Sequence, residues 1–379
     1  MEPIPGTLCS RCVLDTTVPG ITFDSLGECS FCKIHESLER NHPLNEEGKH
    51  QFSTLINRIK REGKNQEYDC IVGVSGGRDS TYTLHIAVEM GLRPLAVHFD
   101  NGWNSEIAVS NIKNATDILD VDLFTVVADW EEFKDLQKAF LWASVPDAEV
   151  PTDYAIISVL MQIANKNQVK YVFNGHSFRT EGVAPIGWTY MDGKYIRSIH
   201  ARYGHLKITS FPLMSLTELM YYTFIRHIRM IDVPEFIEYT HAEVEDVLKN
   251  RLGWRYYGGH HHESVYTEFF QSYYLPNKFG IDKRKLEYSA LIRSGQMKRE
   301  DALKELQQPY PYNREIIDYT LSKLGLTREE FQTIMDAPVK TFKDYPSHYP
   351  TIRASKYFIK LACSLHLLPP VFYEKYLGG

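Results

Sequence analysis

Apolar and polar positions follow two different periods within residues 68–209. Short apolar runs predict buried strands at 70–74, 94–99, 122–127 and 171–173. The stretches between them have helical periodicity, which predicts helices at 80–90, up to residue 119, at 130–143 and at 154–167, with Asp153 as the cap of the last one. Strands that alternate with helices in this way indicate a parallel α/β sheet with crossover helices.

Polar loops follow three of the predicted strands, and they begin at Ser75, Asp100 and Asn174. The carboxyl ends of parallel strands meet at one edge of a sheet, where open α/β sheets bind their ligands. We therefore expect these three loops to border one site.

Beyond residue 210 the pattern is mainly helical, and aromatic residues concentrate at 254–257 and 266–274. We predict four parts for the chain: a zinc-binding module at 1–35, a helical linker at 36–67, an α/β domain at 68–209, and a mainly helical region at 210–379. The last part is expected to contact the substrate or a partner.

Composition narrows the class of protein. The chain has 379 residues, of which 43% are hydrophobic, which is enough for sizeable cores. Its apolar runs fall short of the roughly 20 residues that span a bilayer, and its start lacks the profile of a secretory signal, so we expect no membrane contact and a cytoplasmic location. A net charge of −6 and the lack of a long basic run disfavour nucleic acid as a partner.

Four of the six cysteines lie in the first 32 residues, as two CxxC pairs: Cys9 with Cys12, and Cys29 with Cys32. This spacing is typical of a tetrahedral zinc site in a reducing compartment, and a disulfide framework is the less favoured alternative. Four thiolates leave no open coordination position, so we expect a structural site. Cys70 and Cys363 stand alone in apolar surroundings.

The segment 75–80, with the sequence SGGRDS, lies between the first strand and the first helix. Its glycines allow close approach of an anion to successive backbone N–H groups, and the helix adds its positive end. Ser75 and Ser80 can donate hydroxyl hydrogen bonds, and Asp79 is suited to hold Mg²⁺ against a pyrophosphate. The segment is not a Walker loop, because it lacks the lysine of that motif.

This segment resembles the PP-loop ATP pyrophosphatase superfamily, whose members share SGGxDS and cleave ATP to AMP and pyrophosphate. The resemblance implies ATP contacts at Gly73, Ser75, Gly76, Gly77, Asp79, Ser80, His98, Asp100 and Gly175. It also places His176 near the nucleotide as a candidate catalytic residue. The phosphate-binding lysine that often follows a late Pro-Leu pair is missing here, and Thr217 stands near its place.

A wider combination resembles the N-acetyl sugar amidotransferases: the cysteine module, the SGGRDS loop and the segment 253–264, GWRYYGGHHHES. That family converts a sugar acetamido group into an acetamidino group in surface polysaccharides such as lipopolysaccharide O-antigen and in flagellar glycans. The resemblance implies a nucleotide-linked N-acetyl sugar as substrate, with candidate contacts at Trp254, Tyr257, His260, His261 and His262. His261 and Glu263 are candidate acid/base residues beside Asp79 and His176. The segment could equally be a polar loop without a catalytic role, and its aromatic residues part of the core.

The chemistry implied by this resemblance is adenylation of the amide oxygen by ATP, followed by displacement of AMP by ammonia. The sequence shows no glutaminase of its own, so the resemblance implies separate glutaminase and cyclase-like subunits that supply ammonia. Two alternatives stay open: a tRNA thiolase of the same fold, which would need cysteines near the nucleotide, and a zinc-containing binding module without catalytic activity.

Overall fold

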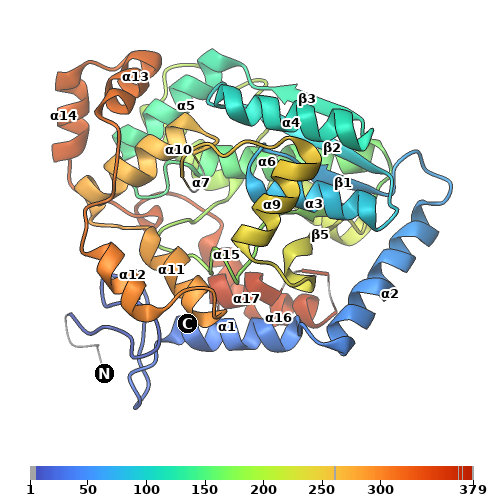
Figure 1. Cartoon of the computed structure of the whole chain (residues 1–379). Coiled ribbons are helices and arrows are strands. Elements are labelled where there is room, and N and C mark those ends of the chain that lie inside the picture. Colours follow the sequence, from blue (N-terminus) through green and yellow to red (C-terminus); the bar gives the residue numbers. More distant parts are fainter. Residues whose placement is uncertain (1–5, 260–261, 366, 369, 378–379) are drawn as a thin grey trace.

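The computed structural model describes residues 6–259, 262–365, 367–368 and 370–377 (Figure 1). Within these residues, five parallel strands form one sheet in the order β3-β2-β1-β4-β5. The strands are β1 (Cys70–Gly73), β2 (Pro94–Asp100), β3 (Leu123–Val127), β4 (Tyr171–Asn174) and β5 (Arg229–Asp232). The predicted parallel α/β sheet is confirmed.

Helices cover both faces of the sheet because successive strand residues point to opposite sides. Cys70 and Val72 of β1 pack against α2 (Glu46–Gly63), α3 (Arg78–Glu89), α4 (Glu106–Leu119) and α9 (His241–Leu252). Ile71, between them, packs on the other face, against α5 (Trp130–Ala143), α6 (Val150–Lys166) and α7 (Gly193–Tyr203). Both faces are buried, which explains why the strands are continuous apolar runs in the sequence.

Two local predictions differ from the structure. Asp153 does not cap its helix, because α6 begins at Val150 after Glu149, with Pro151 in its first turn, so Asp153 lies one turn inside. Strand β5 lies in a region where we predicted mainly helix. Its four residues are all half-buried at the sheet edge and show no alternation of apolar and polar positions, so the local pattern carries no strand signal.

The remaining chain is mainly helical, as predicted. Among the described residues it contains α8 (Leu216–Met220), α10 (Val265–Phe269), the π-helix η3 (Phe270–Phe279), α11 (Arg284–Arg293), α12 (Arg299–Leu306), α13 (Arg314–Leu324), α14 (Arg328–Asp336), α15 (Tyr349–Ala354), α16 (Lys356–Ser364) and α17 (Pro370–Leu377). Helix α1 (Ser30–Asn41), near the N-terminus, lies beside α17 (Figure 1). The described helices include none with the length and apolar character that crossing a membrane demands.

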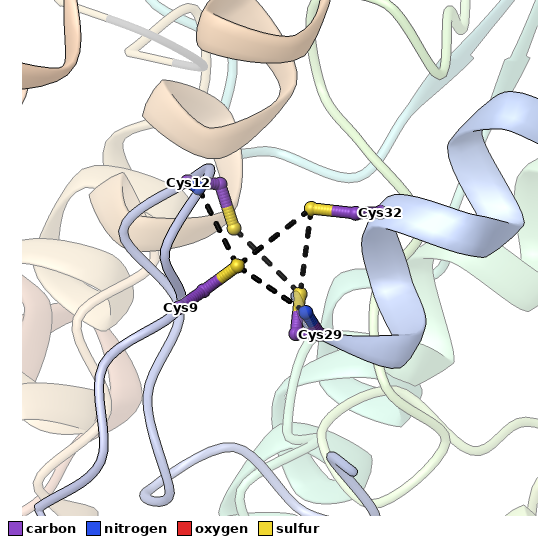
Figure 2. A group of neighbouring side chains, drawn as sticks. All are labelled: Cys9, Cys12, Cys29 and Cys32. Atoms are coloured by element: carbon purple, nitrogen blue, oxygen red, sulfur yellow. Dashed lines mark hydrogen bonds between the residues drawn. The ribbon is translucent and has the colours of Figure 1, made fainter. Parts of the chain in front are cut away.

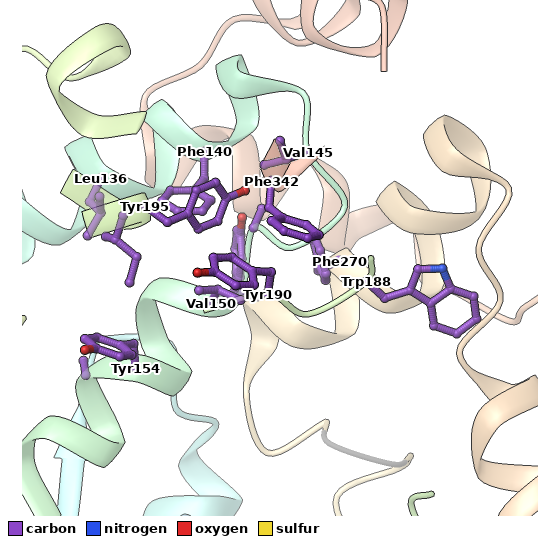
Figure 3. Close-up of a cluster of buried hydrophobic side chains, with 14 of the residues drawn as sticks. Leu136, Phe140, Val145, Val150, Tyr154, Trp188, Tyr190, Tyr195, Phe270 and Phe342 are labelled. Atoms are coloured by element: carbon purple, nitrogen blue, oxygen red, sulfur yellow. The ribbon is translucent and has the colours of Figure 1, made fainter. Parts of the chain in front are cut away.

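An aromatic cluster joins the C-terminal region to the α/β domain (Figure 3). The rings of Tyr190 and Phe342 stack with centroids 4.3 Å apart, and Tyr195 of α7 meets Phe140 of α5 edge to face at 5.8 Å. Phe270 of η3 belongs to the same cluster. Aromatic pairs of this kind dominate core energetics, so the two regions share one core.

Candidate active site

The segment between β1 and α3 is a tight loop held by its own side chains. The backbone N–H of Ser75 donates to the hydroxyl of Ser80 at 3.1 Å, and that of Gly77 donates to the hydroxyl of Ser75 at 3.2 Å. Gly76 has a φ of +78°, and a Cβ there would lie 2.2 Å from the carbonyl oxygen of Ala108 on α4. Only glycine fits this position, because both the backbone conformation and the contact exclude a side chain.

The loop borders a cavity of about 340 Å³ at the carboxyl edge of the sheet. Residues from the loop, from the end of β4 and from the C-terminal region line it: Ser75, Gly77, Arg78, Asp79, Ser80, Asn174, Gly175, His176, Glu181, His241, Trp254, Tyr256, Tyr257, Gly259, Glu263 and Glu287. The loops that follow β1 and β4 therefore share one site, as expected for an open parallel sheet.

Gly175 lets these two loops touch. A Cβ on Gly175 would lie 2.7 Å from the carbonyl carbon of Asp79 and 2.7 Å from the backbone nitrogen of Ser80. Backbone atoms at the start of α3 cannot move away cheaply, so a side chain there would displace the N-terminus of the helix. The two segments that the sequence assigned to nucleotide contact are thus in direct backbone contact.

Asp79 lies at the start of α3 and is held by two neighbours. Its Oδ1 accepts a hydrogen bond from Nε of Arg78 at 3.0 Å and another from the hydroxyl of Tyr239. Arg78 in turn contacts Nε2 of His241 at 2.9 Å and Oε1 of Glu245 at 3.4 Å, both on α9. A carboxylate that is oriented at an anion-binding helix start fits a magnesium ligand.

His176 follows β4 and pairs with Glu181, whose Oε2 lies 2.9 Å from Nδ1 of the histidine. Burial alone would lower the pKa of His176, but the charge and hydrogen bond of Glu181, with Asp232 and Glu235 nearby, raise it to about 10. The imidazole is therefore positively charged at neutral pH. In this form it cannot accept a proton, but it offers a fixed positive charge beside the loop.

Two aromatic residues that we expected to contact the substrate instead contact the loop. The indole N–H of Trp254 donates to the carbonyl oxygen of Gly76 at 3.1 Å, and the hydroxyl of Tyr257 accepts from the backbone N–H of Arg78 at 3.3 Å. Oε1 of Glu263 lies 3.5 Å from the hydroxyl of Ser75. The segment after residue 253 therefore closes over the loop, and Tyr256, Tyr257 and Glu263 line the cavity.

Several predicted ATP contacts lie behind the loop rather than in the cavity. His98 donates through Nδ1 to the carbonyl oxygen of Val74 at 2.8 Å, and Asp100 accepts from the side-chain amide of Asn104 at 2.9 Å. Gly73 faces Leu160 in the core. These residues support the shape of the loop and the adjoining strand end, and their direct contact with ATP stays a prediction.

The histidine run falls partly outside the described residues, since His260 and His261 lie there. The ring of His262 stacks over Gly259, and its Nδ1 lies 3.8 Å from Oε2 of Glu268. A role for His262 in sugar binding stays a prediction.

Sequence reasoning missed Tyr239, His241, Glu245 and Glu181. They lie outside every recognisable motif, and all except Glu181 come to the loop from more than 150 residues away. Arg78 was visible inside the loop, but as the variable position of its motif it gave no signal.

The four N-terminal cysteines converge on one point (Figure 2). Their sulfur atoms are separated by 3.8 Å between Cys9 and Cys32, 3.7 Å between Cys12 and Cys29, and 3.6 Å between Cys29 and Cys32. Four sulfurs bound at about 2.3 Å to one tetrahedral ion stand about 3.8 Å apart. The cluster therefore fits a single ion, whereas thiolates that each bind a different iron of a cluster must stand further apart.

Arginines from the C-terminal region complete this metal centre. Arg293 of α11 is buried, and its guanidinium nitrogens lie 3.4 Å from the sulfurs of Cys32 and Cys12. Arg299 of α12 donates to the carbonyl oxygens of Cys12 at 3.0 Å and Cys9 at 2.9 Å. The cysteine module is thus docked onto α11 and α12, which border the rest of the C-terminal region.

Comparison with known proteins gives one family match and several structural neighbours. Residues 263–359 match the model of the LPS biosynthesis protein WbpG-like, C-terminal domain. No curated protein matches the chain.

The solved structures with similarity to the chain include three ATP-site candidates for comparison. NH3-dependent NAD synthetase from Campylobacter jejuni is 14% identical, with a TM-score of 0.28 over 59% of this chain and 94% of that one. NMN synthetase from Francisella tularensis is 15% identical, with a TM-score of 0.27 over 54% and 93%. U34-tRNA thiolase NcsA from Methanococcus maripaludis is 12% identical, with a TM-score of 0.32 over 89% and 91%. Similarity at this level supports no inference about function.

Proposed function

We propose that this chain, whose residues 263–359 match the WbpG-like C-terminal domain of LPS biosynthesis, is an ATP-dependent amidotransferase. Its substrate would be a nucleotide-linked N-acetyl sugar, and its product the corresponding acetamidino sugar. The observation that carries the proposal is the SGGRDS loop at the rim of a cavity, with Gly175 and His176 converging on it from β4.

The first step is adenylation. The acetamido oxygen attacks the α-phosphorus of ATP, the bond between that phosphorus and the α,β-bridging oxygen breaks, and pyrophosphate leaves. The N–H groups of the loop, the start of α3 and the charged imidazole of His176 would stabilise the negative charge of the leaving group. His176 would thereby supply the positive charge for which the sequence offered no lysine. Mg²⁺ held by Asp79 would add further neutralisation.

The second step replaces oxygen by nitrogen. Ammonia adds to the imidate carbon, its carbon–oxygen bond to AMP breaks, and the amidine forms with loss of a proton. Glu263 lines the cavity and is the candidate to accept that proton. Separate glutaminase and cyclase-like subunits would deliver the ammonia.

The four-cysteine centre would hold structural Zn²⁺, because its sulfur spacing fits one tetrahedral ion and all four ligand positions are filled by thiolates. A thiolase would need cysteines at the nucleotide, yet no cysteine lines the cavity in the described part of the chain. This observation favours nitrogen transfer over sulfur transfer.

The test uses full-length protein with ATP, Mg²⁺, ammonium and a panel of nucleotide-linked N-acetyl sugars. We expect release of pyrophosphate that depends on one sugar, and a sugar product slightly lighter than its substrate by mass spectrometry. Asp79→Asn should lower pyrophosphate release at least a hundredfold, while Asp117→Asn, an exposed position on α4, should leave it unchanged. Equal activity of the parent and Asp79→Asn would contradict the proposal.

A further inference from the structure

A second cavity of about 270 Å³ adjoins the first one. His176, Glu181 and Glu287 line both cavities and so mark the junction between them. Apolar side chains, among them Val183 and Leu286, form part of the wall of the second cavity. A molecule that occupies it would reach the nucleotide loop through this junction.

Basic side chains line only the second cavity. Lys283 stands at the start of α11, and Lys375 comes from α17, so two distant parts of the C-terminal region bring their ammonium groups together. Arg284 also lines the cavity, but it is engaged by Asp282 at 2.6 Å and by the carbonyl oxygen of Gln308 at 2.9 Å. The two lysines are therefore the groups to consider for a ligand.

The two ammonium groups are poorly compensated. The nearest carboxylate oxygen of Glu149 is 3.8 Å from Nζ of Lys283, and Glu149 also accepts from Gln271 at 3.3 Å. Burial lowers the pKa of Lys375 to about 8, and the charge of Lys283 acts in the same direction, against a weaker contribution from Asp153. Two cations facing one cavity repel each other, and a bound anion would relieve that repulsion.

We infer that the second cavity binds the diphosphate of the nucleotide-linked sugar through Lys375 and Lys283, with the acetamido group directed to the junction at His176. The inference rests on the proposed function, because adenylation requires the acetamido oxygen to meet the α-phosphorus of ATP held in the first cavity. A substrate that enters through the second cavity reaches that point from the side opposite the loop's own helix, without displacing ATP.

The experiment measures binding of UDP-N-acetylglucosamine to the full-length protein by calorimetry, with a non-hydrolysable ATP analogue present at saturation. We expect binding to the parent, and a loss of roughly tenfold or more in affinity for Lys375→Met and for Lys283→Met, since each removes a charge-assisted hydrogen bond. Lys375→Arg keeps the charge and should retain most of the affinity. Lys360→Met, on an exposed face of α16, removes the same charge elsewhere and should bind as the parent does.

Parent-like affinity of both methionine variants would overturn the inference, as would competition between the sugar nucleotide and the ATP analogue. Failure of UDP-N-acetylglucosamine, UDP and inorganic diphosphate alike to bind the parent would also overturn it. Binding of the ATP analogue alone, measured in the same variants, shows that each is folded. If the sugar nucleotide binds through Lys375 but no acetamidino product ever forms, the proposed function fails while the second site stands.

Discussion

The indole N–H of Trp254 donates to the carbonyl oxygen of Gly76 at 3.1 Å, across 178 residues of sequence. Asn111 of α4 donates to the same oxygen, also at 3.1 Å. The nucleotide loop is therefore held from behind by a helix of the α/β domain and from above by the C-terminal region. Its shape depends on the packing of the whole chain as well as on its own six residues.

Replacing Trp254 by Phe should weaken ATP binding about fivefold, because one hydrogen bond worth roughly 1 kcal/mol is lost while Asn111 still holds Gly76. Calorimetric titration with ATP gives the affinity, and thermal unfolding reports any loss of stability. Trp142→Phe, in a partly buried position on α5, is the matched control and should leave ATP affinity unchanged. An equal effect of both substitutions would mean that Trp254 acts through general packing.

Much of the α/β domain could be predicted because its physical signals are local. Strands β1, β2 and β4 are buried on both faces and appear as apolar runs, and the SGGRDS loop contains its own turn chemistry. Strand β5 gave no such signal, because it is a short, half-buried edge strand whose pairing with β4 is decided by tertiary contact.

The site was predictable only where one segment contains it. Asp79 and Gly175 follow strand ends, so sequence reasoning found them, and the structure brings them together. Tyr239 and His241 reach the loop by long-range packing, which spacing along the chain cannot reveal. Trp254 and Tyr257 were identified as important, but their roles differ from the prediction, since composition does not distinguish a ring that stacks on a sugar from one that holds a loop.

Two glycines that we assigned to nucleotide binding should respond differently to alanine. A Cβ at Gly175 would press on backbone atoms of Asp79 and Ser80 at 2.7 Å, whereas one at Gly73 would meet the flexible side chain of Leu160 at 3.1 Å. We expect Gly175→Ala to lower ATP affinity at least tenfold and Gly73→Ala to change it by less than about threefold. Both affinities come from one titration series with ATP, and a comparable loss in both variants would assign Gly73 a direct role.

Arg293 should slow the loss of metal from the cysteine centre. Its guanidinium lies 3.4 Å from two of the four sulfurs and partly offsets the negative charge that four thiolates leave on a divalent ion. Arg293→Met should therefore release zinc to a chromogenic chelator roughly tenfold faster than the parent does. Arg299→Met is the control, because Arg299 contacts the backbone of Cys9 and Cys12 rather than their sulfurs. Release at the same rate from both variants would show that docking of the module, not charge, sets the rate.

The buried carboxyl of Asp147 should make stability fall at alkaline pH. Burial raises its pKa to about 8, and its Oδ1 accepts the hydroxyl of Tyr195 at 2.8 Å. The native state holds this proton more tightly than the unfolded chain, where the pKa is near 4, so its stabilising contribution is present at low pH and is lost as pH rises through the folded pKa. Asp147→Asn stays neutral at every pH. Its melting temperature should therefore decline less than that of the parent between pH 6 and pH 9, a difference of roughly 1–3 kcal/mol in the free energy of unfolding. Asp301→Asn removes an exposed carboxylate from α12 and should follow the parent curve. Parallel curves for the parent and Asp147→Asn would show that this carboxyl is already ionised in the folded protein at neutral pH.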